Sequence, residues 1–97
     1  MPEFVFVYRL PQDYQIGDPA TGAAWSAWFA DLGADLLDIG KPVAAVAPVG
    51  NCGPESRLAG YTKIAAKDRA SAEAIASRCP ALASGGGVEV GTLLDRP

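Results

Sequence analysis

Apolar side chains alternate along the first ten positions of the chain and later recur at helical spacing, which predicts a mixed α+β fold. The segment EFVFVYRL, residues 3–10, is rich in β-branched and aromatic side chains and ends at a proline, as strands do. The alternation gives this strand two apolar faces, one with Phe4, Phe6, Tyr8 and Leu10 and the other with Val5 and Val7. A strand that is apolar on both faces is usually covered on both.

Two further segments have the spacing of helices. The first is expected from about Thr21 or Gly22 to Leu36, because its large apolar residues fall at i, i+3, i+4, i+7 and i+11. Those residues are Trp25, Trp28, Phe29, Leu32 and Leu36. Gly33 within this stretch indicates a close approach or an early end of the helix. The second helix is expected over Ser71–Arg78, with Ser71 as N-cap and Pro80 as its stop.

Three more strands complete the prediction. They are expected over Val43–Val49, Leu58–Ala66 and Val88–Leu94, and a turn over residues 38–42 precedes the first of them. The glycine run at 85–87 is expected to be a tight turn that leads into the last strand. The resulting order is β-α-β-β-α-β, which is the ferredoxin-like pattern: a four-stranded antiparallel sheet with two helices on one face. One domain over residues 1–97 is expected.

This arrangement leaves one face of the sheet without a cover. Two helices protect only one face, whereas the first strand is apolar on both until Arg9. A second copy of the chain is the simplest cover, because most oligomers are built from identical subunits. The sequence therefore predicts a homodimer that forms through the sheet face.

Composition removes several classes of function. Apolar residues make up 49% of the 97 residues, enough for a core. The net charge is -3 and Lys and Arg are scattered, which argues against nucleic-acid binding. No segment reaches the roughly 18 apolar residues that cross a bilayer. The beginning of the chain does not resemble a signal peptide, and two cysteines make no disulfide framework, so a cytoplasmic location is expected. The absence of His excludes Ser-His and Cys-His pairs and His metal ligands, and no cofactor or metal is expected.

Three segments together resemble one family of small bacterial proteins. They are FVFVYRL at residues 4–10, WSAWFADLGADLLDIGKPV at 25–43 and LAGYTKIAAKDRASAEAIASRCPALASGGGVEV at 58–90. In order and spacing they resemble the YCII-related (DGPF-type) family. The resemblance implies a ferredoxin-like subunit that pairs sheet to sheet as a dimeric α/β barrel. Most of that family has no established reaction, so the resemblance implies fold more than function.

The chain departs from this family in two places. The connection before the third strand is short and lacks the Asp-Gly-Pro-Phe signature, with only Cys52-Gly53-Pro54 nearby. Some members carry a His and an Asp proposed as a catalytic pair, but this chain has no His. That activity therefore cannot be transferred to it.

Aromatic residues give the first candidate site. Trp25 and Trp28, with Tyr8 and Tyr61, are candidate walls of an apolar pocket between the first helix and the sheet, and Asp38 or Arg9 is the candidate polar contact there. The alternative is that these aromatic residues only pack the core or a dimer contact, as apolar stripes on helices commonly do.

Carboxylates and cysteines give the remaining candidates. Asp31, Asp35 and Asp38 lie close in sequence; one of them could act as a general base, with Asp38 the best candidate, or the group could hold a hard cation. The alternative is a solvated helix face followed by a turn in which Asp38 bonds its own backbone. Cys79 lies at a helix C-terminus and is expected to be buried and inert, whereas nothing in the sequence activates Cys52.

Three functions remain open at this point. The first is binding of a small organic molecule in the apolar pocket. The second is a cofactor-free enzyme that acts on a small cyclic or aromatic substrate through the Asp38 base, which rests on analogy between folds. The third is an accessory protein that binds another protein through an exposed apolar patch.

Overall fold

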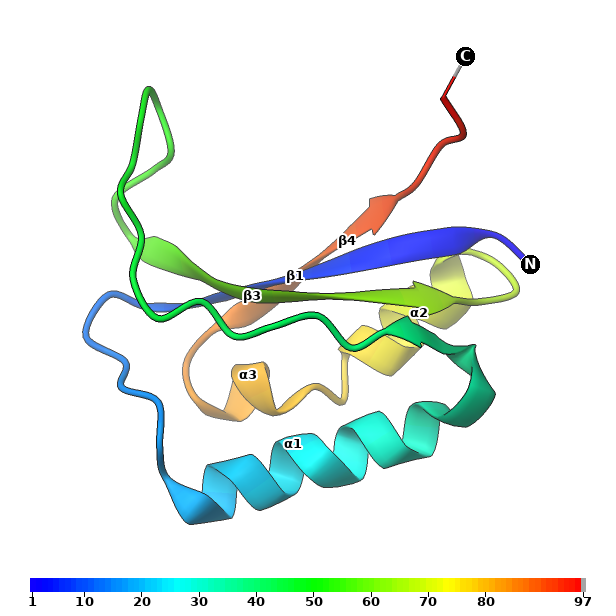
Figure 1. Ribbon diagram of the computed structural model, residues 1–97, viewed down its shortest axis with the longest axis horizontal. Helices are drawn as coiled ribbons and strands as arrows, with labels where there is room; N and C mark the ends of the chain where they lie inside the picture. The colour runs from blue at the N-terminus through cyan, green and yellow to red at the C-terminus, as the bar shows by residue number, and fades with distance from the viewer. Residues whose placement is uncertain (97) are drawn as a thin grey trace.

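The computed structural model describes residues 1–96 as an open four-stranded antiparallel sheet whose helices all lie on one side (Figure 1). Residue 97, the last of the predicted domain, lies outside the described residues. The elements in chain order are β1 (Glu3–Pro11), α1 (Pro19–Leu32), the 3-10 helix η1 (Gly33–Asp35), β2 (Leu36–Asp38), β3 (Ser56–Ala65), α2 (Arg69–Ala76), α3 (Pro80–Ala83) and β4 (Gly87–Thr92). The strands lie in the order β2-β3-β1-β4. The α+β class and the antiparallel four-stranded sheet predicted from the sequence are confirmed.

The core lies between β1 and the helices. Phe4, Phe6, Tyr8 and Leu10 are each at most 5% exposed and form the centre of one apolar cluster with residues of β3 and all three α-helices. Trp28 of α1 packs on Phe6, with ring centroids 5.8 Å apart. Its Nε1 donates to the carbonyl of Ile75 at 3.2 Å, so one side chain fixes α1 to both the sheet and α2.

Helix α1 begins earlier and ends earlier than the spacing of its apolar residues predicts. Asp18 is the N-cap, because its carboxylate accepts from the Ala20 backbone N–H at 3.2 Å. Pro19 occupies the first helical turn, where a proline costs no hydrogen bond. At the other end Gly33 has a φ of 55°, in the left-handed region, which stops the α-helix there. Leu36, predicted as the last helical residue, is therefore released into a strand.

The prediction of a strand over Val43–Val49 is wrong. Strand β2 is instead Leu36–Asp38, and it pairs with Ile64 and Lys63 of β3. Residues 43–49 follow the edge of β3 only at their beginning, where the Val43 N–H donates to the Ala59 carbonyl at 2.8 Å. Pro48 has no N–H to donate to a sheet. Because α1 ends at Leu32, residues 36–38 are free to form the strand at this edge of β3 instead.

The C-terminal half also differs in its boundaries. Asp68, not Ser71, caps α2 by accepting the Ser71 backbone N–H at 2.8 Å. That bond to the carboxylate lowers the pKa of Asp68. Pro80 does not simply stop a helix: it begins α3, a short helix that the sequence pattern did not predict. The glycine run serves close packing, because a Cβ on Gly86 would overlap the carbonyl of Arg9.

The second face of the sheet has no helix over it (Figure 1). Along β1 this face carries Val5 and Val7, both half-buried, between Glu3 and Arg9. No helix among the described residues is long and apolar enough to cross a membrane. The cover predicted for this face is thus not supplied by residues 1–96, which the structure describes.

Candidate functional site

A cavity of about 480 Å³ lies on the helix side of the sheet, between the start of α1, the loop before it and residues 39–42. It is partly open to solvent. Most of its lining is apolar or aromatic: Tyr8, Leu10, Tyr14, Trp25, Phe29 and Ile39. Among the described lining residues, Asp18 and Lys41 carry the only charges. A size of this order and an apolar lining are typical of small-molecule sites.

Aromatic rings from two elements form one wall of the cavity. Tyr8 of β1 meets Trp25 edge to face, with centroids 4.7 Å apart and an interplanar angle of 80°. Trp25 in turn lies 5.7 Å from Phe29, one helical turn further along α1. Each ring is held by contacts with the next, so the wall is largely preformed.

A buried hydrogen-bond chain supports this wall from beneath. The Tyr8 hydroxyl donates to Thr62 Oγ1 at 2.6 Å, and the Thr62 hydroxyl donates to the Ile39 carbonyl at 2.9 Å. Thr62 is fully buried. Burial raises the pKa of Tyr8, so its phenol stays protonated and donates a hydrogen bond. These two hydrogen bonds link β1 and β3 to the segment around Ile39, which forms the far rim of the cavity.

Arg57 joins the two loops beside the cavity, a role for which the sequence pattern contains no signal. Its guanidinium donates to the Val43 carbonyl at 2.9 Å and to the Tyr14 carbonyl at 3.4 Å. Both acceptors are backbone groups of segments far apart in the sequence. A donor fork on a half-buried arginine can satisfy two such carbonyls at once, which links the two segments.

Three of the residues that the sequence singled out meet at this cavity: Tyr8, Trp25 and Tyr61. Tyr61 lies on β3 opposite Val7 and reaches the cavity at its rim, where its ring edge and carbonyl lie against Gly40. Gly40 has a φ of 69°, in the left-handed region, and a Cβ there would overlap the Tyr61 carbonyl. The rim at this point is therefore closed by backbone, and only glycine fits it.

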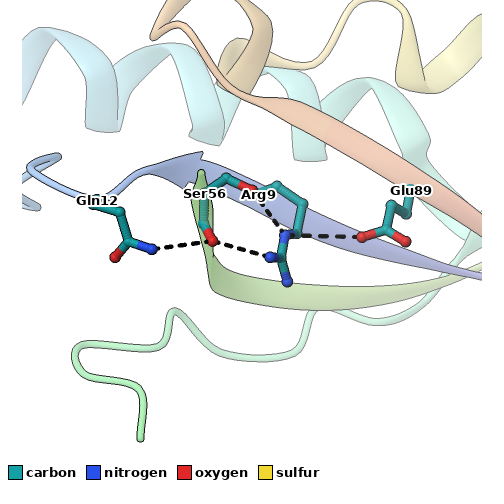
Figure 2. Close-up of polar contacts among 4 residues, drawn as sticks. All are labelled: Arg9, Gln12, Ser56 and Glu89. Atoms are coloured by element: carbon teal, nitrogen blue, oxygen red, sulfur yellow. Dashed lines mark hydrogen bonds and ion pairs between the residues drawn. The ribbon is translucent and has the colours of Figure 1, made fainter. Parts of the chain in front are cut away.

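Arg9 does not line the cavity, because strand alternation turns it to the open face. Its Nε and Nη2 donate to the Oγ and carbonyl of Ser56 at 3.1 and 3.0 Å. Figure 2 shows the guanidinium between Ser56 and Glu89, whose carboxylate lies 3.9 Å from Arg9 Nε. Gln12 binds the same Ser56 carbonyl from the other side at 3.3 Å. Arg9 thus binds the start of β3 on the open face and does not contact a ligand on the helix side.

Trp28 also lies outside the cavity. Its ring is buried on Phe6, and it lines a second, more open hollow of about 510 Å³ between α1, α2 and α3. Asp31 and Asp35 border that hollow, together with Arg78. The described residues contain no group of three or more His, Cys, Asp or Glu side chains that could hold a metal ion.

Asp38 stabilises a turn and does not reach the cavity. Its Oδ1 accepts the Gly40 backbone N–H at 2.8 Å. Aspartates before a glycine turn commonly form this local bond. The lining carboxylate, Asp18, is likewise engaged as the α1 cap and also accepts the Thr21 hydroxyl at 2.9 Å. The candidate general base is therefore placed away from the aromatic wall.

The two cysteines have opposite environments. Cys79 is 3% exposed, and burial raises the pKa of its thiol to about 11. The thiol therefore stays protonated and unreactive near neutral pH. Cys52 is exposed in the loop before β3, where its Sγ donates to the Val49 carbonyl at 3.3 Å.

Comparison with known proteins adds no relative: no family model, no curated protein and no solved structure matches the chain.

Proposed function

We propose that this protein binds a small, largely apolar organic molecule in the cavity beside α1. The observation that carries the proposal is the cavity itself, with its wall of the contacting aromatic rings of Tyr8, Trp25 and Phe29. A flat ring system fits such a wall best, because aromatic faces and edges offer favourable stacking in addition to burial. The buried bonds of Tyr8 and Thr62 give the wall a fixed position before any ligand arrives.

We infer further that the chain is a ferredoxin-like subunit and that two copies pair through their open sheet faces. The order of elements and the strand order β2-β3-β1-β4 support the first inference, with α3 as an addition. The half-buried valines on a face without a helix support the second. The resemblance to the YCII-related family points the same way, to a dimeric α/β barrel.

Neither alternative function has a comparable observation in its favour. An acid–base enzyme would need a carboxylate in the cavity that is not already engaged. Asp18 lines the cavity but caps α1, and Asp38 lies outside the lining and bonds the Gly40 N–H in a turn. A docking module for another protein would need an exposed apolar patch besides the face proposed for the dimer. Ligand binding is therefore the function that the geometry supports best.

The test fills the cavity without disturbing the fold. Gly22 lines the cavity, has no positive φ, and a Cβ there meets no atom within 4 Å. Gly22→Leu should therefore fold and should occupy the space in front of Trp25. Ala23→Leu is the matched control, because Ala23 is exposed on the same helix and is not part of the lining.

The probe is 2-naphthol, a neutral bicyclic aromatic, followed by ligand-observed NMR and by Trp fluorescence. We expect wild type and Ala23→Leu to bind it with a Kd on the order of 1 mM or below. Gly22→Leu should lose binding at least tenfold. Equal binding by both variants, or none by wild type, would overturn the proposal.

A further inference from the structure

The open face carries a charge pattern along β1 that is complementary to itself. Reading along the strand, this face presents Glu3, Val5, Val7 and Arg9, which is one negative end, an apolar centre and one positive end. The strand read backwards has the opposite charge at each end. A second copy laid over it in the reverse direction therefore places opposite charges together at both ends and valine against valine in the centre.

We propose that two copies pair through this face with their β1 strands antiparallel, so that Glu3 of one copy lies opposite the partner's Arg9. The inference rests on the homodimer proposed above and adds its orientation. The two-fold axis passes between Val5 and Val7 and crosses β1 at a right angle. Each dimer then has two equivalent Glu3–Arg9 contacts at the ends of a shared apolar strip.

The neighbouring strands agree with this orientation. Lys63 of β3 lies beside Val5, and Glu89 of β4 lies beside Val7. In the antiparallel arrangement Lys63 faces the partner's Tyr61, and Glu89 faces the partner's Gly91, so no like charges meet. In the parallel arrangement Glu3 would face the partner's Glu3. Like charges placed opposite one another cost free energy and reject that pairing.

The borders of the face also favour a second sheet as its occupant. Figure 1 shows the loop of residues 43–55 and the C-terminal segment rising from the sheet on the side away from the helices. Both carry strongly exposed apolar side chains, Val49 at 89% and Leu94 at 87%. A sheet that enters between these segments would be flanked by apolar residues on two sides.

The ion pairs within one chain give the test its power. Glu3 pairs with Lys63 at 3.0 Å, and Arg9 lies 3.9 Å from Glu89. Swapping both charges, as Glu3→Arg with Arg9→Glu, makes each of these intrachain contacts repulsive. The same swap restores both contacts between antiparallel copies. Intrachain and interchain roles therefore predict opposite results for the double variant.

The measurement is the dimer Kd from sedimentation equilibrium over a dilution series in low-salt buffer. We expect Glu3→Arg and Arg9→Glu each to weaken the dimer by about tenfold or more, and the double variant to return within about threefold of wild type. Glu73→Arg is the control for net charge, because Glu73 is exposed on α2, away from this face. A double variant weaker than both single variants overturns the orientation.

Cross-linking keeps the test decisive if Arg9→Glu folds poorly. In a Cys52→Ser background, a short bismaleimide should join two chains of the Glu3→Cys/Arg9→Cys variant but not of Glu3→Cys alone. Cross-linking of Glu3→Cys alone would mean a parallel pairing and would overturn the orientation while leaving the dimer. A wild-type monomer at all concentrations would overturn both, and the cavity test with Gly22→Leu would still stand by itself.

Discussion

The two faces of β1 have different chemistry although both begin as apolar sets in the sequence. The helix-covered face carries large rings and Leu10, all nearly inaccessible, and its neighbours across the sheet include Ile64 and Val90. The open face carries two valines, and its neighbours include Lys63 and Glu89. The apolar residues of β1 do not by themselves distinguish a core from a contact surface. The charges at the two ends of the open face of β1, Glu3 and Arg9, and those on the strands beside it do.

The largest contrast between the faces should appear on truncation of one residue from each. Phe6→Ala removes a fully buried ring that packs on Trp28. We expect it to lower the free energy of unfolding by about 3–5 kcal/mol. Val7→Ala, on the half-buried face, should cost about 1 kcal/mol or less in dilute solution. Urea denaturation of both variants measures the difference. Equal losses would contradict the distinction between the faces.

Dilution sharpens this comparison further. If copies pair through the open face, the cost of Val7→Ala should grow with protein concentration, because dimerisation stabilises the folded chain. The cost of Phe6→Ala should not depend on concentration in the same way, because its neighbours are in the same chain.

The covered face also contains a fully buried threonine, Thr62. Thr62→Val keeps the shape but leaves the Tyr8 hydroxyl and the Ile39 carbonyl without their partner. We expect a loss of about 1–3 kcal/mol in urea denaturation. Tyr8→Phe is the matched variant, and it should cost less because Thr62 keeps its bond to Ile39. An unchanged free energy of unfolding in Thr62→Val would mean that water replaces the two hydrogen bonds of Thr62.

High pH should destabilise the core on the covered face. Burial raises the pKa of two groups, Tyr8 and Cys79, and both belong to this core. The pKa of Cys79 rises from 9.0 to about 11, so the unfolded chain loses this proton first as pH increases. The contribution of the protonated Cys79 thiol to the free energy of unfolding is fully present below about pH 9. It is lost as pH approaches 11, by at most about 2 kcal/mol. The raised pKa of Tyr8 adds to the loss above about pH 10.

The measurement for this effect is urea denaturation at increasing pH, with Cys79→Ala as the control. The variant is less stable at neutral pH because it leaves a small cavity, but it should lose less stability between about pH 9 and pH 11. An identical pH dependence of wild type and variant would show that the thiol is not shielded from solvent.

The strongest sequence patterns predicted the elements that match the structure. The alternation of residues 3–10 indicated β1 and the residues of its two faces, but not which face the helices cover, and the stripe from Trp25 to Leu32 indicated the packed side of α1. The edge of the sheet was misplaced because strand β2 has three residues, too few to show a period of two. Its position depends on where Gly33 ends the helix, which is a backbone property.

The candidate site was predictable to the extent that rings define it. Trp25 and Tyr8 were found because aromatic side chains at regular spacing must pack against something. Trp28 shares that spacing, yet the rotation of α1 places it deeper, on Phe6. Arg57 could not be found, because its partners are the backbone carbonyls of Val43 and Tyr14, and any residue type supplies a carbonyl.

Because Cys52 is exposed and Cys79 is buried, the reactivity of the two thiols reports opening of the core. A thiol reagent should modify one sulfur in the folded protein and two once the core is exposed. The rate at which Cys79 reacts then reports how often α2 and α3 separate from the sheet, without a cysteine being introduced. Trapping such moments while a ligand fills the cavity would tell how firmly binding on one side of α1 holds the helices on the other.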